Sequence, residues 1–260
     1  MSDECKSQTQ SANPLLGLRL NQALAYSGLC SRKAAARLIA TGQVLVNQQL
    51  QPHHYIVKAG DHIRVAGQPL PTPPARQYWL YHKPVGIDCN VKLGDPQSIA
   101  QLLAQLPVRL FPLGRLDKDS SGLLLLSNDG ALSQQLMHAT TGQQKHYVVD
   151  VDQAVQPQLL QQLCAGVQWQ IGPHTYRSKP CQVRLQSPNQ LLFTLTEGQN
   201  RQIRYMCRAV GLRVITLHRF GINDLRLSSA DVVGTCRPLT AAELGQLQAQ
   251  PDLLEQPDIL

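Results

Sequence analysis

The alternation of apolar and polar positions divides the 260-residue chain into a short helical segment and a longer strand-rich segment. Leu20 and Leu24 at helical spacing predict a helix over residues 18–26, which Gly28 would stop. Ser31 is a suitable N-cap for a second helix over residues 32–40, whose polar positions are basic. The apolar run after that helix predicts a strand over residues 44–46, and residues 59–65 read as a Gly-Asp turn that leads into a second strand.

A proline-rich stretch, GQPLPTPPAR, follows the helical segment at residues 67–76. Four prolines in six residues favour an extended, semi-rigid spacer over a core element. We therefore expect a domain boundary here. The expected divisions are a flexible tail (1–17), a small helix-turn-helix-plus-strands domain (18–66), the linker (67–76), a larger domain (77–245) and a frayed tail (246–260).

In the longer segment, strand patterns and helix patterns are interspersed without regular β-α-β alternation. The run Leu123–Leu126 is apolar without interruption, which is typical of a strand that is buried on both faces. This arrangement predicts an α+β domain with a mixed, largely antiparallel sheet flanked by helices. Strands are expected at 78–84, 123–126, 145–152, 182–186 and 191–198, and helices at 131–138 and 200–210.

Charge points to a polyanionic partner. The net charge is +7, of which residues 1–76 carry +5 and residues 77–260 carry +2. Positive charge that is concentrated in a small leading domain favours nucleic acid, although a solvated basic face is the plainer alternative. No apolar stretch approaches the roughly 20 residues of a membrane span, and the polar start is not a secretory signal. We expect a cytoplasmic protein without membrane contact, acting as a monomer.

The pattern of cysteines and glycines argues against a metal or a cofactor. The seven cysteines are widely spaced and include no C-x-x-C pair, and the eight histidines do not cluster. The chain also has no glycine-rich phosphate loop and no Rossmann fingerprint. We therefore expect no metal site, no cofactor, and cysteines that are reduced.

An all-arginine stripe marks the helix predicted over residues 200–210. Arg201, Arg204 and Arg208 fall on one face at helical spacing, with no acidic residue beside them in the helix. Like charges repel, so an anion should relieve them, either RNA phosphate or a buried carboxylate. The alternative is a solvent-facing stripe, which would more often mix Lys and Glu.

Asp117 lies in the loop RLDKDSSG, just before the apolar run. Taken alone, an aspartate in such a loop is more typical of a turn former than of a catalyst. A strand that is buried on both faces, however, holds its end rigidly, which suits a catalytic group. We expect an arginine from another part of the chain to lower the pKa of Asp117 and keep the carboxylate ionised.

Three motifs resemble those of the ribosomal RNA pseudouridine synthases of the small-subunit/large-subunit type. They are GRLDKDSSGLLLLSNDG, KHYVV and GQNRQIRYMC. The leading RLNQALAYSGLCSRKAAARLIATGQVLVNQQ is similar to the RNA-binding module named after ribosomal small-subunit protein four. Together with KPVGI, the motifs look closest to the F-type enzymes of the large subunit. Tyr205 departs from the pattern, because most relatives have a second arginine there, and this puts one backbone contact in doubt.

The resemblance implies the isomerisation of uridine to pseudouridine in a central RNA-binding cleft. Asp117 would attack the ribose C1′ or the uracil C6, Tyr147 would lie against the flipped base, and Arg204 would pair with Asp117. The RNA partner would be a stem-loop of 23S ribosomal RNA, with a tRNA anticodon uridine as the second candidate. The residues implied in RNA binding are Arg19, Arg32, Lys33, Arg37, Arg115, Arg201 and Arg208.

The chemistry agrees with these roles. The reaction oxidises nothing and consumes nothing, and a carboxylate is a reasonable nucleophile at a sugar carbon with oxocarbenium character. A target base within a helix must be flipped out of its stack, and an aromatic face such as that of Tyr147 can receive it. Two alternatives stay open at this point. One is a non-catalytic protein that binds structured RNA, and the other is a carbohydrate-active enzyme with Asp119 as its second carboxylate.

Overall fold

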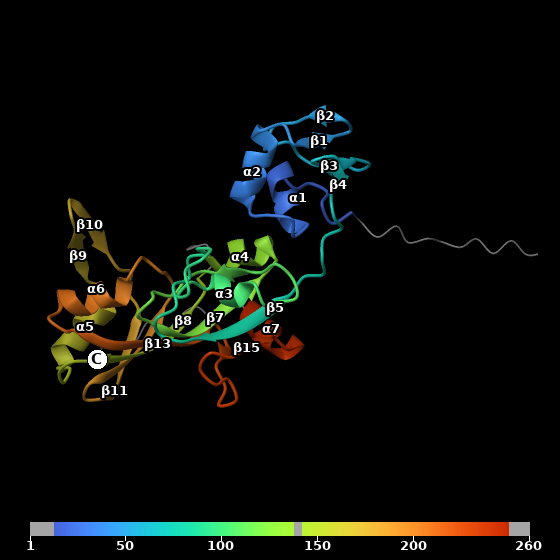
Figure 1. Ribbon diagram of the computed structural model, residues 1–260. Coiled ribbons are helices and arrows are strands. Elements are labelled where there is room, and N and C mark those ends of the chain that lie inside the picture. Colours follow the sequence, from blue (N-terminus) through green and yellow to red (C-terminus); the bar gives the residue numbers. More distant parts are fainter. Residues whose placement is uncertain (1–12, 138–141, 250–260) are drawn as a thin grey trace, which may run out of the picture. The chain divides into compact units, whose positions relative to one another are not determined.

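The computed structural model describes residues 13–137 and 142–249. The chain forms two compact units, Met1–Arg76 and Gln77–Leu260, which Figure 1 shows in blue and in green to red. Within the described ranges, no helix combines the length and the apolar character that a membrane span requires.

The first unit packs two helices and a small antiparallel sheet around one core, in which Leu20, Leu24 and Val44 are fully buried. The sheet has the strand order β2-β1-β3-β4. Helix α2 begins as the sequence predicts, because the Ser31 hydroxyl accepts a hydrogen bond from the amide of Ala34 at 3.1 Å. The elements are α1 (Leu20–Tyr26), α2 (Arg32–Ala40), β1 (Val44–Val46), β2 (Gln49–Leu50), β3 (Ile63–Val65) and β4 (Gln68–Pro69).

Two expectations for this unit need correction. Strand β4 lies inside the stretch predicted as a linker, because Gly67 takes a positive φ of 77° and turns the chain back along β3. Pro69 is tolerated there because β4 is an edge strand. The predicted tail 1–17 also contributes to the core, since Leu15 is only 9% exposed; residues 1–12 lie outside the described ranges.

The second unit is built on a mixed, largely antiparallel sheet, as the sequence predicts. The strand order is β11-β12-β8-β13-β7-β5-β15, with β6 paired to β7 and β14 to β13, and β13 and β7 run parallel. The strands are β5 (Tyr78–Lys83), β6 (Phe111–Leu113), β7 (Ser121–Ser127), β8 (Lys145–Val151), β11 (Gln182–Ser187), β12 (Gln190–Leu195), β13 (Val214–Ile222), β14 (Leu225–Arg226) and β15 (Cys236–Pro238).

Helices and one separate hairpin accompany this sheet. Figure 1 shows the β9–β10 hairpin projecting from the second unit beside α6. The remaining elements are α3 (Ala100–Leu103), α4 (Gly130–Met137), α5 (Pro157–Ala165), β9 (Gln168–Ile171), β10 (His174–Arg177), α6 (Gln202–Ala209) and α7 (Ala241–Gln248).

Strand β7 is buried on both faces, as its unbroken apolar run predicts. Leu124 and Leu126 belong to one hydrophobic cluster of the unit, whereas Leu123 and Leu125 belong to another. All four leucines are at most 1% exposed. Because alternate side chains of a strand point to opposite faces, β7 is clamped between two cores and positions its ends firmly.

The predicted frayed tail begins too early at residue 246. Helix α7 continues to Gln248, and Leu247 is fully buried. Thr240 and Glu243 form a capping box at the start of this helix, and Arg237 binds Glu243 at 2.7 Å. These contacts hold a segment whose own pattern is weak, so its order could not be read from the sequence. Residues 250–260 lie outside the described ranges.

The buried His146 on β8 predicts a loss of stability in acid. Its Nδ1 lies 3.0 Å from the Thr194 hydroxyl and its Nε2 lies 3.1 Å from the Asn223 carbonyl oxygen. Burial, with a contribution from the nearby Arg226 charge, lowers its pKa to about 4. In the unfolded chain the histidine takes up a proton near pH 6.5, whereas in the folded chain it stays neutral down to about pH 4. The contribution of His146 to the free energy of unfolding is therefore complete above pH 6.5 and is lost as the pH falls towards 4.

We expect the free energy of unfolding to fall by about 2–3 kcal/mol more in the wild type than in His146→Gln between pH 7.5 and pH 4.5. Urea unfolding at the two pH values measures this difference. His174→Gln, a change at an exposed histidine of β10, is the control and should behave as the wild type. Equal pH dependence in all three proteins would show that His146 is not held neutral.

Candidate active site

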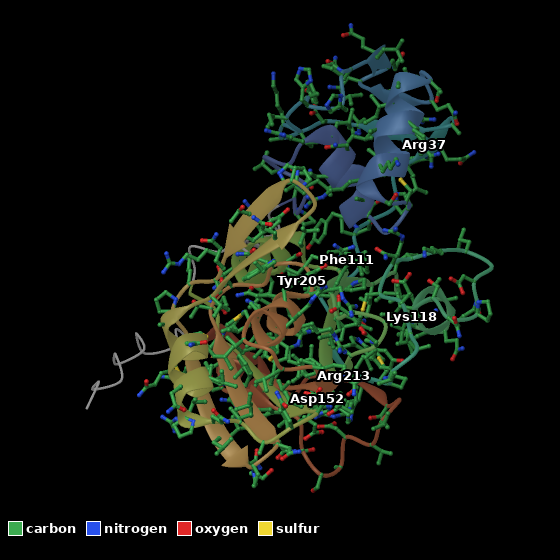
Figure 2. The ribbon with its side chains drawn as sticks, turned by 90° about the vertical axis from the view of Figure 1, so that its left-hand side faces the viewer. Arg37, Phe111, Lys118, Asp152, Tyr205 and Arg213 are labelled. Atoms are coloured by element: carbon green, nitrogen blue, oxygen red, sulfur yellow. The ribbon has the colours of Figure 1, made fainter. Side chains whose placement is uncertain are left out.

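Asp117 lies in the loop between β6 and β7, and this loop is held by neighbouring backbone groups. The Ser120 amide donates to the Asp117 carbonyl oxygen at 3.1 Å, and the Gly86 amide donates to the Lys118 carbonyl oxygen at 2.7 Å. The Leu116 amide also donates to Cys89 Sγ at 3.4 Å. The loop, on which Lys118 is labelled in Figure 2, is thus fixed on both sides of the aspartate.

A cavity of about 470 Å³ opens beside this loop. Asp117 lies on one wall, and Tyr147 of β8 and Arg219 of β13 lie on others. The start of α6 closes a further side through its N-cap residue Arg201 and through Ile203. Residues from across the second unit therefore meet at one hollow, large enough for a nucleobase and mixed in character.

Asp117 and Asp119 are two residues apart, yet their environments differ. Burial raises the pKa of Asp117, and the charges of Arg201, Arg204 and Lys83 offset this only in part. Burial also acts on Asp119, but hydrogen bonds from Arg201 and the Arg204 charge outweigh it and lower the pKa. Arg201 therefore acts on the pKa of Asp117 in the predicted direction, but the burial of this carboxylate outweighs the effect and the pKa is raised overall.

The arginine stripe of α6 has a carboxylate partner, but that partner is Asp119. Arg201 binds the two oxygens of Asp119 at 3.1 and 2.8 Å. Arg204 Nη2 lies 3.3 Å from the Asp119 carboxylate and 2.9 Å from its carbonyl oxygen. Within the described residues, the ion pair formed by Asp117 is with Arg201, at 3.9 Å. The predicted pairing of Arg204 with Asp117 is thus replaced by a clamp from both arginines on Asp119, while Arg208 is exposed.

Tyr147 faces the cavity from the middle of β8. It is 8% exposed, and its register partners are Phe193 on β12 and Arg219 on β13. Tyr147, Val149 and Val151 share one face and are all buried, as the alternation of the segment predicts. The ring is therefore held in place by the sheet and lines the same hollow as Asp117.

Tyr205, the residue of α6 that departs from the quoted motif pattern, packs against the β9–β10 hairpin. Its ring stacks on Trp169 of β9, with centroids 6.1 Å apart and planes 1° from parallel. Trp169 in turn stacks on Tyr176 of β10 at 6.0 Å. Tyr205, labelled in Figure 2, therefore joins α6 to the β9–β10 hairpin through aromatic packing.

Several site residues were not predicted. Lys83 is fully buried and donates to the carbonyl oxygens of Pro84 and Ile87 at 2.9 and 2.8 Å. Burial lowers its pKa, although Asp117 and Asp119 favour its charged form. A lysine at the end of an apolar strand, directly before Pro84, is a sequence signal that could have identified Lys83 as a buried charged residue of the site. Lys145 begins the quoted motif KHYVV, which was a usable signal, whereas nothing in the local pattern distinguished Arg219, which reaches the cavity through the pairing of β13 with β8.

The basic residues predicted for the first unit lie on its surface. Arg32, Lys33 and Arg37 are exposed on α2, and Arg19 is exposed immediately before α1. Arg37 is labelled in Figure 2. In the second unit, Arg115 is also exposed and its Nη1 donates to the Asn90 side-chain oxygen at 3.0 Å.

The geometry disfavours a glycosidase-like pair of carboxylates. Asp117 and Asp119 belong to one loop, and Asp119 is bound by Arg201 and Arg204. A second acid or base for sugar hydrolysis would have to face the scissile bond from the opposite side. The other carboxylate that lines the cavity, Asp88, is bound by Lys92 at 2.9 Å and by the Asn90 amide at 2.9 Å. The lining also includes the aromatic ring of Tyr147 and the basic groups of Lys145 and Arg219.

Comparison with known proteins agrees with this geometry. Residues 77–209 match the RNA pseudouridylate synthase family, and residues 18–63 match the S4 domain. The chain is 36% identical to the dual-specificity RNA pseudouridine synthase RluF of Escherichia coli (strain K12), over 89% of this chain and 78% of that protein. It is 33% identical to ribosomal large subunit pseudouridine synthase B of Bacillus subtilis (strain 168), over 90% and 97%.

A solved structure supports the fold assignment. The crystal structure of a pseudouridylate synthase superimposes with a TM-score of 0.65 and 27% identity, covering 88% of this chain and 99% of the other. Named synthases of this kind, matched along most of the chain, disfavour a protein that only binds RNA. The chain belongs to the RNA pseudouridylate synthase family and is a pseudouridine synthase that carries an S4 domain.

Proposed function

We propose that Asp117 is the catalytic carboxylate and that it acts on a flipped-out uridine in the cavity. The observation that carries this assignment is a half-buried carboxylate, with a raised pKa, that shares a nucleobase-sized hollow with Tyr147. A raised pKa marks a carboxylate that solvent and partners stabilise poorly, and such a group is a better nucleophile or base. Asp119, bound by two arginines, is suited to holding the loop.

In this proposal, Tyr147 receives the uracil against its ring and can assist removal of the C5 proton. Arg204 acts through Asp119, because its guanidinium fixes the loop that carries Asp117. Arg201 has a second part, since it lies 3.9 Å from Asp117 and can counter the charge on that carboxylate. The reaction needs no oxidant and no exchanged group, so these side chains suffice for the isomerisation.

The RNA that we propose as substrate is a stem-loop of large-subunit ribosomal RNA, with a tRNA anticodon uridine as the second candidate. One relative is named for the ribosomal large subunit and another for dual specificity. Arg19, Arg32, Lys33 and Arg37 of the S4 domain are suited to phosphate contacts, which position an RNA without reading its sequence. Such a substrate places the enzyme in the cytoplasm.

In the second unit, exposure separates the basic residues that are suited to RNA contacts from those that are not. Arg115 and Arg208 are exposed and can reach the RNA backbone. Arg201 is less suited to bind phosphate, because Asp119 already occupies both of its terminal nitrogens. We therefore assign Arg201 to the loop clamp first and to RNA only second.

Release of tritium from RNA labelled at uridine C5 tests the function and names the substrate. The C5 hydrogen must leave when C5 becomes the glycosidic carbon, so the assay works on an RNA whose target uridine has not been located. Large-subunit rRNA, small-subunit rRNA and bulk tRNA are tested separately, with Asp117→Asn as the blank. We expect release from large-subunit rRNA that stops at one equivalent per molecule. Release from small-subunit rRNA alone would contradict the proposed substrate.

A further inference from the structure

Arg219 is a buried arginine with an unused hydrogen-bond donor at the cavity. It is 4% exposed, and its Nε donates to the Leu123 carbonyl oxygen at 2.8 Å, which fixes the plane of the guanidinium. Its Nη2 is buried and has no hydrogen-bond partner within residues 13–137 and 142–249. A buried donor without a partner costs free energy, so such a group calls for an acceptor that the protein itself does not supply.

The sheet directs Arg219 towards the place that a substrate base would occupy. Arg219 on β13 is the register partner of Tyr147 on β8, and directly opposed side chains lie on the same face of a sheet. Both residues line the cavity of about 470 Å³, together with Asp117. A base lying against Tyr147 would therefore have the free donor of Arg219 at its edge.

The charges of the cavity wall that contains Arg219 favour an electron-rich group of the substrate. Lys145 also lines the cavity, and burial together with the Arg219 charge lowers its pKa to about 8. Within the described residues, no salt bridge is formed by Arg219 or Lys145, whereas the arginines across the cavity bind Asp119. Two basic groups thus share one wall of the hollow, and a neutral base that becomes negative during the reaction would suit them.

The chemistry supplies such a base by either route. If Asp117 attacks C1′, the N1–C1′ bond breaks, its electron pair goes to the base, and negative charge spreads over N1, O2 and O4. If Asp117 adds to C6, the C5=C6 electron pair moves towards C4 and negative charge appears on O4 as an enolate. A carbonyl oxygen of uracil, O4 in both routes, therefore gains charge before the C5 proton leaves. A fixed donor aimed at that oxygen would lower the barrier.

We propose that Arg219 donates its free N–H to a carbonyl oxygen of the flipped uracil and stabilises the negative charge that develops there. This inference rests on the proposed position of the uridine between Asp117 and Tyr147. It makes Arg219 a catalytic residue that contacts the substrate. If the contacted oxygen is O4, the same donor also disfavours cytosine, which has an amino group in that place.

Substitution of both partners of this contact tests the proposal. The full-length wild type and Arg219→Met are compared in C5 tritium release from RNA containing uridine, 4-thiouridine or 2-thiouridine at the target site, because a thiocarbonyl is a weak acceptor. We expect Arg219→Met to lower kcat on uridine by roughly 100-fold, with RNA affinity changed less than about threefold. On the thio-substituted RNA that lacks the contacted oxygen, kcat of Arg219→Met should be less than about fivefold below that of the wild type.

Matched variants separate this role from a structural one. Arg184→Met, at an exposed position on β11, should leave kcat unchanged. Arg219→Gln can still donate to the Leu123 carbonyl oxygen and serves if Arg219→Met does not fold. If Arg219→Met lowers kcat by the same factor on all three RNAs, the proposal is overturned, since Arg219 would then act only by holding the fold. A kcat within threefold of the wild type on uridine would overturn it as well.

The result is distinguishable from failure of the proposed active site. If Asp117→Asn is inactive while Arg219→Met keeps its activity, only the role of Arg219 is refuted. If Asp117→Asn retains activity, the position of the uridine is wrong, and with it the basis of the inference. If the difference in kcat between the wild type and Arg219→Met disappears with 2-thiouridine and not with 4-thiouridine, the contact is at O2.

Discussion

Replacement of Asp117 by Asn is expected to lower the single-turnover rate of C5 tritium release by about four orders of magnitude or more. The Asp117 carboxylate can bond to an electron-poor carbon of the substrate, and an amide is a far weaker nucleophile. Because Asn has nearly the same shape, the loop should keep its position and RNA affinity should change little. Quenched-flow release and a filter-binding titration measure the two quantities on the same RNA.

The matched control is Asp119→Asn, two residues along the same loop. Asp119 is bound by Arg201 at 2.8 Å and by Arg204 at 3.3 Å, so its loss weakens the clamp that positions Asp117. We expect a reduction of roughly 10- to 100-fold, the usual effect of a small misplacement of reacting groups. If Asp119→Asn instead abolished the reaction and Asp117→Asn did not, the roles of the two carboxylates would be exchanged.

Gly122→Ala is expected to destabilise the second unit by about 4 kcal/mol or more. Gly122 begins the apolar run of β7 and takes a φ of 112°, a conformation that an L side chain rarely adopts. A Cβ at this position would lie 2.7 Å from the backbone nitrogen of Arg219 and closer still to its carbonyl oxygen. Since both neighbours are backbone atoms of the paired strand β13, the overlap could be relieved only by separating β7 from β13.

Urea unfolding of the variant measures this effect, and Gly245→Ala is the control. Gly245 lies in α7 with open space around it and no positive φ, so alanine should stabilise the helix by roughly 0.5–1 kcal/mol. A stability of Gly122→Ala within about 1 kcal/mol of the wild type would show that the two strands can move apart at little cost. Any folded Gly122→Ala protein should also have impaired activity, because Arg219 follows the displaced strand.

Most of the elements were determined locally by the sequence. The Ser31 cap and the apolar spacing after it were enough to place α2 at Arg32–Ala40, and the four leucines of β7 identified a strand that is buried on both faces. These signals are local, because a cap or a periodicity acts within a few residues. The quoted motifs likewise pointed to Asp117 and Tyr147, which the folded chain brings to one cavity.

The ends of the domains depended on contacts that no local pattern contains. Leu15 in the predicted tail and Leu247 beyond the predicted end are both buried against residues distant in the sequence. The turn at Gly67 returned the chain to the first sheet, although the prolines around it suggested a spacer. Tertiary packing outweighed weak or contrary local preference in each case.

The tertiary structure alone decided how charge is arranged in the site. Helical spacing predicted the stripe of Arg201, Arg204 and Arg208, but only the folded chain shows that the first two bind Asp119. Local motifs cannot specify this, because the ion pairs join residues more than 80 positions apart and the pKa of Asp117 depends on its burial. Arg219 likewise reaches the cavity only because β13 pairs with β8, so the sequence determined the elements and the catalytic candidates, whereas long-range packing decided their partners.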